Sequence, residues 1–221
     1  MTCDQQRFEG DVAQHEMAII RDAGIDRHIK FRRPGDSAYW FEILTWPGSL
    51  CIRGDCGTFV FSRLTDMFEF FRGECKDPTK LYINVGYWCE KLQAVDCTGY
   101  GDGRAREFSP EIFEARVKGH FESYFETRAI SDEKRASLWR NITWEVLEHI
   151  HDGEIRAFDR LHDFRDEDFP RLFEDCWEWN CKEYTFHFMW CLYAIAWAIR
   201  MYDAAKATTV IDAPAEANDA V

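Results

Sequence analysis

The fold of the N-terminal half is decided by residues 39–62, which read YWFEILTWPGSLCIRGDCGTFVFS. Three segments in it are dense in the aromatic and β-branched residues that favour strands: residues 39–45, 50–53 and 58–62. Between them, Pro47-Gly48 and the segment from Gly54 to Gly57 supply the fixed φ of proline and the free φ of glycine that tight turns require. The stretch therefore predicts three short antiparallel strands joined as a β-meander.

The regions on either side of the meander carry weaker signals. The polar segment before it is expected to hold a short helix at residues 12–22. After the meander, residues 65–73 read as a short helix with Thr65 as its N-cap and Gly73 at its end. Residues 81–85 are rich in strand formers, and we expect a strand there.

Helices dominate the second half. Ser109-Pro110-Glu111 combines an N-cap, a proline at the first helical position and an early acid, which together predict a helix start. Every fourth residue that follows is apolar and forms one buried stripe: Phe113, Val117, Phe121 and Phe125. A second helix is expected from Ser131 to Gly153, with an apolar face of Leu138, Ile142, Val146 and Ile150. Further helices are expected at residues 154–164, 169–179 and 184–205.

These elements predict an α+β protein, with an N-terminal antiparallel β-meander followed by a mainly helical C-terminal half. The glycine-rich loop Gly99-Tyr100-Gly101-Asp102-Gly103 is the best place for a boundary. We therefore expect an α+β region at residues 1–103, a helical region at 104–206 packed around its last helix, and a disordered tail at 207–221. The apolar run of that last helix, residues 184–199, is shorter than the roughly 20 residues that a membrane span needs, which favours a buried helix.

The composition excludes some classes of protein. The 221 residues include 35 aromatic side chains, enough apolar surface to exclude an intrinsically disordered chain. With 27 basic and 40 acidic residues the net charge is −13, which disfavours direct binding to nucleic acid. A polar N-terminus without the apolar core of a signal peptide indicates a cytosolic protein, in which the nine cysteines are expected to be mostly buried thiols.

The acidic charge is concentrated in one region. Residues 107–178 carry 10 basic and 19 acidic groups, a net of −9, whereas residues 1–106 carry a net of −2. Solvated helix faces would explain this pattern, but so would a surface that binds a basic or nucleic-acid-binding protein. Aromatic side chains are enriched at protein interfaces. For a partner-binding surface, the candidate residues are Glu111, Glu122, Glu126, Asp166, Glu167, Asp168, Trp177 and Trp179.

Signals for catalysis, metal or cofactor are weak, and none of these is predicted. His149, His151 and Asp152 could contribute to a divalent-metal site, but no further ligands lie at supporting spacings. The pairs Cys51/Cys56 and Cys176/Cys181 could in principle bind zinc, although buried thiols explain them better. The three glycines of the loop at 99–103 lack the lysine and serine or threonine of a phosphate-binding loop.

The meander resembles a group of proteins from tailed phages and prophages, in which a Trp-Pro-Gly turn precedes Gly-Asp-x-Gly and an aromatic strand. The matching residues are 41–48 and 54–61, and the aromatic run at 186–195 is similar to the same group. Some phage proteins of this kind act against bacterial antiviral systems, and the chain resembles the Gabija anti-defence protein among them. That resemblance implies a non-catalytic protein that binds and encloses a nuclease complex, and it brings no catalytic residue with it.

We therefore expect a phage-encoded inhibitor that acts in the host bacterial cytoplasm. It would bind and block an antiviral defence protein, of the anti-Gabija or anti-CRISPR type, and homo-oligomerisation is left open. Two alternatives remain: a metal-dependent hydrolase that uses His149, His151 and Asp152, and a structural or assembly factor of a phage particle.

Overall fold

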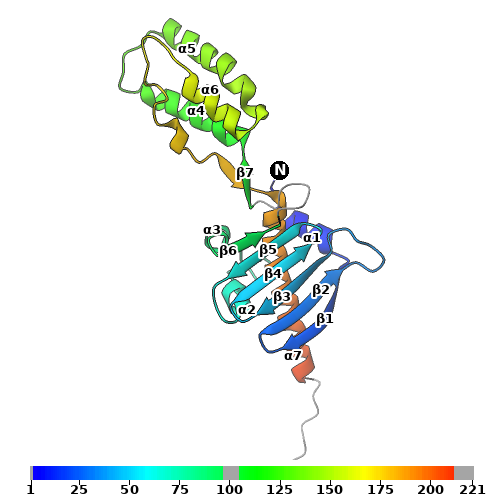
Figure 1. The fold of residues 1–221 in the computed structure, drawn as a ribbon. Coiled ribbons are helices and arrows are strands. Elements are labelled where there is room, and N and C mark those ends of the chain that lie inside the picture. The colour runs from blue at the N-terminus through cyan, green and yellow to red at the C-terminus, as the bar shows by residue number, and fades with distance from the viewer. Residues whose placement is uncertain (1, 97–104, 212–221) are drawn as a thin grey trace, which may run out of the picture. The chain divides into compact units, whose positions relative to one another are not determined.

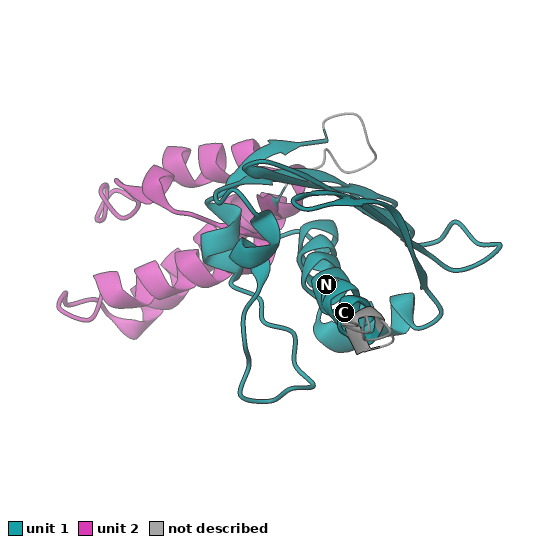
Figure 2. Ribbon diagram, turned by 90° about the horizontal axis from the view of Figure 1, so that it is seen from below, with its two compact units in different colours: residues 1–105, 184–221 teal, residues 106–183 magenta. Residues whose placement is uncertain are grey.

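The computed structural model describes residues 2–96 and 105–211, with the side chains of residues 209–211 excepted. The chain divides into two units (Figure 2). Unit 1 is formed by residues 1–105 and 184–221, and unit 2 by the inserted segment Arg106–Glu183. The predicted α+β class is confirmed, since an antiparallel sheet from the N-terminal half is followed by a mainly helical C-terminal half.

Unit 1 is built on a six-stranded sheet in which every strand pairs antiparallel with its neighbour in the sequence (Figure 1). Its strands are β1 (Glu16–Ala23), β2 (Asp26–Arg32), β3 (Phe41–Trp46), β4 (Ser49–Gly54), β5 (Gly57–Ser62) and β6 (Leu92–Val95). The predicted meander is confirmed as β3, β4 and β5. Gly48 in its first turn has a φ of 83°, a conformation that glycine adopts without the steric cost of a side chain.

One face of the sheet is apolar because strand residues alternate between its two sides. Ile29, Ile43, Ile52 and Phe59 lie opposite one another across β2 to β5, and all four are fully buried. Gly54, at the end of β4, lies so close to the chain at Trp40 that a Cβ atom there would be 2.1 Å from the Trp40 carbonyl oxygen. The sheet therefore depends on a glycine at this position.

Four helices complete unit 1: α1 (Gln5–Val12), α2 (Met67–Phe71), α3 (Val85–Cys89) and α7 (Phe186–Ile211). The sheet curves around α7 (Figure 2), and aromatic side chains join the two. The centroids of Phe41 and Trp190 are 5.5 Å apart, and those of Phe59 and Phe188 are 5.3 Å apart. Helix α1 packs on another side of α7, with Phe8 5.1 Å from Trp190. Burial from several directions explains why α7 is apolar all round.

The expected division into domains is wrong for α7. We expected residues 184–206 to lie at the centre of the helical region, but they complete the core of unit 1. The apolar face of the sheet needs a cover, and the helices of unit 2 bury their stripes against one another. Of the expected tail at 207–221, residues 207–211 continue α7, and the rest lies outside the described residues. The glycine loop at 99–103 is outside them as well.

Unit 2 is a small helical module of α4 (Pro110–Tyr124), α5 (Asp132–Glu145) and α6 (Glu154–Asp163), with 3₁₀ turns η1 (Leu147–Asp152) and η2 (Cys176–Glu178). Strands β7 (Arg106–Phe108) and β8 (Lys182–Tyr184) pair where the inserted segment begins and ends. Ser109 caps α4 as predicted, Ser131 caps α5, and the predicted stripes meet in one core. The helix expected from Ser131 to Gly153 is shorter, because α5 ends at Glu145 and the 3₁₀ turn η1 follows it.

Several other local predictions are wrong or shifted. Residues 16–23 form strand β1 where a helix was expected, because pairing with β2 outweighs the helix propensity of their alanines and methionine. Asp66, not Thr65, caps α2. Residues 81–84 form no strand, since the Asn84 side chain caps α3 instead.

Residues 169–179 form consecutive tight turns in place of the expected helix. Backbone N–H groups there bond to carbonyls three residues earlier, as from Leu172 to Phe169 and from Trp179 to Cys176. The apolar residues Phe169, Leu172, Cys176 and Trp179 are spaced by three, four and three residues, which is the pattern of an α-helix, so this spacing alone does not predict the turns.

None of the helices that the structure describes has both the length and the apolar character needed to cross a bilayer, α7 included.

Candidate protein-binding surface on unit 2

Unit 2 carries the most exposed large apolar side chains in the described part of the chain. These are Ile155, Trp144 and Trp177, with exposed fractions of 77%, 68% and 66%. Burying a large apolar side chain stabilises by about 1.5 to 3 kcal/mol. Because these three side chains remain in water in the folded unit, a partner protein that buried them would gain free energy of that size from each. Trp and Tyr side chains in such positions are frequent anchors of protein interfaces.

The local fold explains why these three side chains point into solvent. Trp144 lies in the last turn of α5, two residues after the buried Ile142, and therefore on the opposite face of that helix. Ile155 is in the first turn of α6, whose buried face is formed by Ala157 and Leu161. Trp177 follows the buried Cys176 in η2. Each is displaced from the buried stripe of its own element.

A groove between α4 and α5 offers a receptor for an apolar side chain. Its volume is about 320 Å³, and its apolar wall contains Phe121 and Trp139, whose ring centroids are 5.1 Å apart. Charged residues line the rest: Lys118, Glu122, Asp132 and Arg135. An aromatic wall with charged residues around it suits an anchor side chain from a partner protein.

Unit 2 as a whole is acidic. Residues 106–183 carry 12 basic and 20 acidic groups, a net of −8. Of the predicted partner-binding residues, Glu122, Glu126 and Glu167 are exposed, and none of them makes an ion pair with any described residue. Their charge is therefore available to a basic partner.

Other predicted residues have structural roles in unit 2. Glu111 is exposed at the start of α4 and accepts a hydrogen bond of 3.2 Å from the Ser109 hydroxyl. Its pKa is lowered by hydrogen bonds from its own backbone N–H and from that hydroxyl. Asp166 and Asp168 both pair with Lys134 on α5, at 3.3 and 2.7 Å, which raises the pKa of the lysine. Their charge is thus partly neutralised.

The two tryptophans predicted to bind a partner differ in their exposure to solvent. Trp177 is exposed as expected, but Trp179 is half-buried in the core of unit 2, with its ring 5.2 Å from that of His120 and 6.3 Å from that of Phe173. Of the two, only Trp177 is therefore largely exposed. Trp144 and Ile155 were missed, although their positions off the apolar stripes of α5 and α6 could have identified them.

The residues that suggested a metal do not converge. His149 and Asp152 share a face of η1 as predicted, with 3.5 Å between Nδ1 and Oδ2, and His151 is exposed nearby. Cys51 and Cys56 belong to unit 1, whereas Cys176 and Cys181 lie in the core of unit 2. Across residues 2–96 and 105–211, no three histidine, cysteine or acidic side chains are grouped as ligands of one ion.

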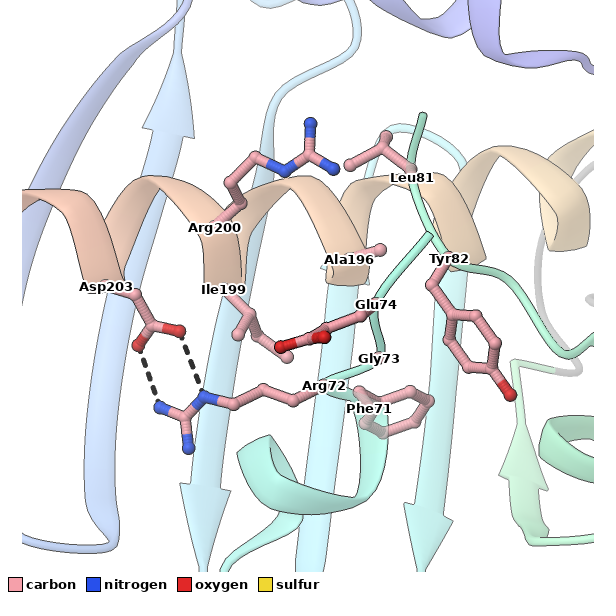
Figure 3. Close-up of a pocket in the computed structure, with 10 residues that line it drawn as sticks. All are labelled: Phe71, Arg72, Gly73, Glu74, Leu81, Tyr82, Ala196, Ile199, Arg200 and Asp203. Atoms are coloured by element: carbon pink, nitrogen blue, oxygen red, sulfur yellow. Dashed lines mark hydrogen bonds and ion pairs between the residues drawn. The ribbon is translucent and has the colours of Figure 1, made fainter. Parts of the chain in front are cut away.

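Unit 1 has one pocket worth comparing with this surface, about 280 Å³ in volume, between α2, residues 73–82 and α7 (Figure 3). Most of its charged side chains already form hydrogen bonds or ion pairs within the protein. Arg72 donates two hydrogen bonds to Asp203, at 2.9 and 2.8 Å, and Arg200 donates one to the Lys80 carbonyl. The residues that line it include two carboxylates, Glu74 and Asp203, but no serine, cysteine or histidine.

Comparison of the chain with protein-family models, with curated proteins and with solved structures found no match.

Proposed function

We propose that the protein is a phage-encoded, non-catalytic inhibitor that binds a bacterial antiviral defence protein, of the Gabija or CRISPR type, and blocks it. The observation that carries the proposal is the exposure of Trp144, Ile155 and Trp177 on an acidic helical unit. The resemblance of the β-meander to phage proteins supplies the phage origin.

The negative charge of unit 2 and its exposed tryptophans would have separate effects on binding. Negative charge accelerates encounter with a basic surface, such as the nucleic-acid-binding face of a nuclease or an RNA-guided effector. The exposed tryptophans then supply the short-range contacts that slow dissociation. A protein that covers such a face prevents the defence complex from reaching its nucleic acid, and no chemistry is required of the inhibitor.

A phage-plating assay tests this proposal. Bacteria that carry a Gabija or a CRISPR system would express the chain, and the efficiency of plating of a sensitive phage would be measured. We expect the wild type to restore plating in at least one of these strains. The double variant Trp144→Ala, Trp177→Ala should lose the effect, because it removes the main apolar contacts without touching a core residue.

The matched control is Trp46→Ala, which removes an exposed tryptophan from the sheet of unit 1 and should retain activity. Failure to restore plating in every strain, at verified expression, would contradict the proposal. Equal activity of the double variant and the wild type would show that unit 2 is not the contact surface. Retention of the protein in purified virions would favour a structural or assembly role.

A further inference from the structure

Strand β1 leaves one long edge of the sheet without a neighbour. It is eight residues long and pairs with β2 on one side, while no strand among the described residues pairs with its other side (Figure 1). All its residues except Met17 are exposed, and Ile20 has an exposed fraction of 60%. Alternate backbone N–H and C=O groups on such an edge are able to pair with another strand.

The register with β2 fixes the face of the sheet on which each β1 side chain lies. Met17 and Ile19 lie opposite the buried Phe31 and Ile29, and therefore on the α7 side of the sheet. Glu16 and Arg21 lie on the other side, which α7 does not cover. In a regular strand, residues five apart such as Glu16 and Arg21 would lie on opposite faces. They share a face here because the register shifts between Ile19 and Arg21, which leaves Ile20 as an extra residue in a β-bulge.

The same bulge makes β1 complementary to itself. When two copies of β1 run antiparallel with Ala18 opposite Ala18, Met17 of each copy lies opposite Ile19 of the other, and all four side chains are on the α7 side. Beyond this centre, Ile20 and Arg21 of one copy together oppose Glu16 of the other, as two residues of a bulge oppose one partner residue. Glu16 and Arg21 are then on the same face.

We propose that the protein forms a two-fold symmetric dimer in which the β1 edges of two copies pair antiparallel and join their sheets into one. The charge pattern specifies a second copy, because the register pairs Glu16 with Arg21 at both ends of the shared ladder. Neither residue has an ion pair within the described part of the chain, so both are available. Opposite charges across a ladder are stabilising and like charges are destabilising.

The predicted contact is small, consisting of one strand and a few apolar side chains. Interfaces of this size support weak, micromolar association. A bulge on an edge strand ordinarily discourages pairing with unrelated strands. Here it leaves pairing with a second copy open, because Glu16 of that copy meets Arg21 of the bulge with the opposite charge.

Sedimentation velocity of the full chain tests the dimer over roughly 5 to 500 µM, a range that brackets micromolar affinity. We expect the wild type to pass from monomer to dimer within it. The variants Glu16→Arg and Arg21→Glu each place like charges opposite one another twice, and each should weaken the dimer about tenfold or more. The double variant Glu16→Arg, Arg21→Glu restores opposite charges in reversed order and should recover the dimer.

Arg63→Glu is the matched control, because it reverses an exposed arginine away from β1 and should leave the dimer unchanged. Circular dichroism of each variant checks the fold, which is expected to persist because both substituted side chains are exposed. A wild type that stays monomeric over the whole range would overturn the proposal. A dimer that resists the single substitutions, or that the charge-swapped variant fails to recover, would also overturn it, since the contact would then lie elsewhere.

Discussion

Asp66 ties strand β2 to the start of helix α2. Its two carboxylate oxygens accept hydrogen bonds of 2.9 and 2.8 Å from the guanidinium of Arg27, and Oδ1 also accepts the backbone N–H of Phe68 at 2.9 Å. Arg27 is buried, with its guanidinium carbon 4.4 Å from the centroid of the Phe68 ring. One carboxylate thus neutralises a buried cation and caps a helix.

Replacing Asp66 by alanine should therefore destabilise unit 1 strongly. Removing one member of a buried ion pair costs about 3 to 5 kcal/mol, because the other charge stays buried without a partner. Urea denaturation of Asp66→Ala measures the loss. The control is Asp77→Ala, whose exposed carboxylate bonds only to Thr79 and whose loss should cost about 1 kcal/mol or less. Equal unfolding free energies for the two variants would contradict this account of Asp66.

The same ion pair predicts a dependence on pH. Hydrogen bonds from Arg27 hold the pKa of Asp66 below its usual value of 3.8. As the pH falls, the unfolded chain takes up the proton first, so the stabilisation is complete above about pH 5 and is lost as the pH drops through the folded pKa. Asp66→Asn cannot titrate. The difference in unfolding free energy between the wild type and Asp66→Asn should thus be largest near neutral pH and shrink below pH 4, and a difference that is constant with pH would refute the linkage.

Substitutions of the C-terminal tryptophans should change the free energy of unfolding by very different amounts, depending on whether the side chain is buried or exposed. Trp190 is fully buried and contacts Phe8, Tyr39 and Phe41, so Trp190→Ala should cost about 3 to 5 kcal/mol. Trp177→Ala removes an exposed side chain and should change the free energy of unfolding by about 0.5 kcal/mol or less. Thermal unfolding of the two variants gives the comparison. A large loss for Trp177→Ala would mean that its side chain is packed and unavailable to a partner.

Two glycines should respond in opposite directions to alanine. At Gly54 a Cβ atom would lie 2.1 Å from the Trp40 carbonyl oxygen and 2.7 Å from the Phe41 Cα, so Gly54→Ala should destabilise by about 2 kcal/mol or more. Gly10 lies within α1 with no atom within 4 Å of its Cβ position, and Gly10→Ala should stabilise by about 0.5 to 1 kcal/mol. Chemical denaturation measures both changes. A neutral Gly54→Ala would show that β3 and β4 are more loosely joined than described.

The sequence could predict those elements whose turns, caps or apolar stripes are formed by residues close together in the chain. The turns at Gly48 and Gly57, the caps Ser109 and Ser131, and the four-residue stripe of α4 all depend on residues close in the chain. Strand β1 depends on pairing with β2 across a short turn, which outweighs the helix propensity of its own residues. The assignment of α7 to unit 1 depends on contacts with distant strands, which periodicity does not contain. A helix apolar on all sides is recognisably buried, but its sequence does not say which layer buries it.

The residues of the candidate surface could be predicted only in part, because some of their contacts also join distant parts of the chain. Exposed acids such as Glu122 and Glu126 could be read from the apolar stripe that begins in α4, whereas Trp177 lies in a series of turns where a helix was expected. The ion pairs of Asp166 and Asp168 with Lys134 join a loop to a helix more than 30 residues away, so sequence spacing could not reveal them. Trp179 was a candidate because aromatic side chains are enriched at interfaces, but the turns of its segment place its ring beside that of His120.

The central claim is that unit 2 binds a defence complex through its exposed tryptophans, and it is tested most directly by measuring the dissociation constant for the purified Gabija nuclease complex. We expect saturable binding that Trp144→Ala, Trp177→Ala weakens about tenfold or more, while Trp46→Ala leaves it unchanged. Raising the salt from about 0.1 to about 0.5 M should also weaken it, because it screens the acidic surface. The same affinity for the wild type and the double tryptophan variant, or no binding to this complex or to a CRISPR effector, would contradict the account.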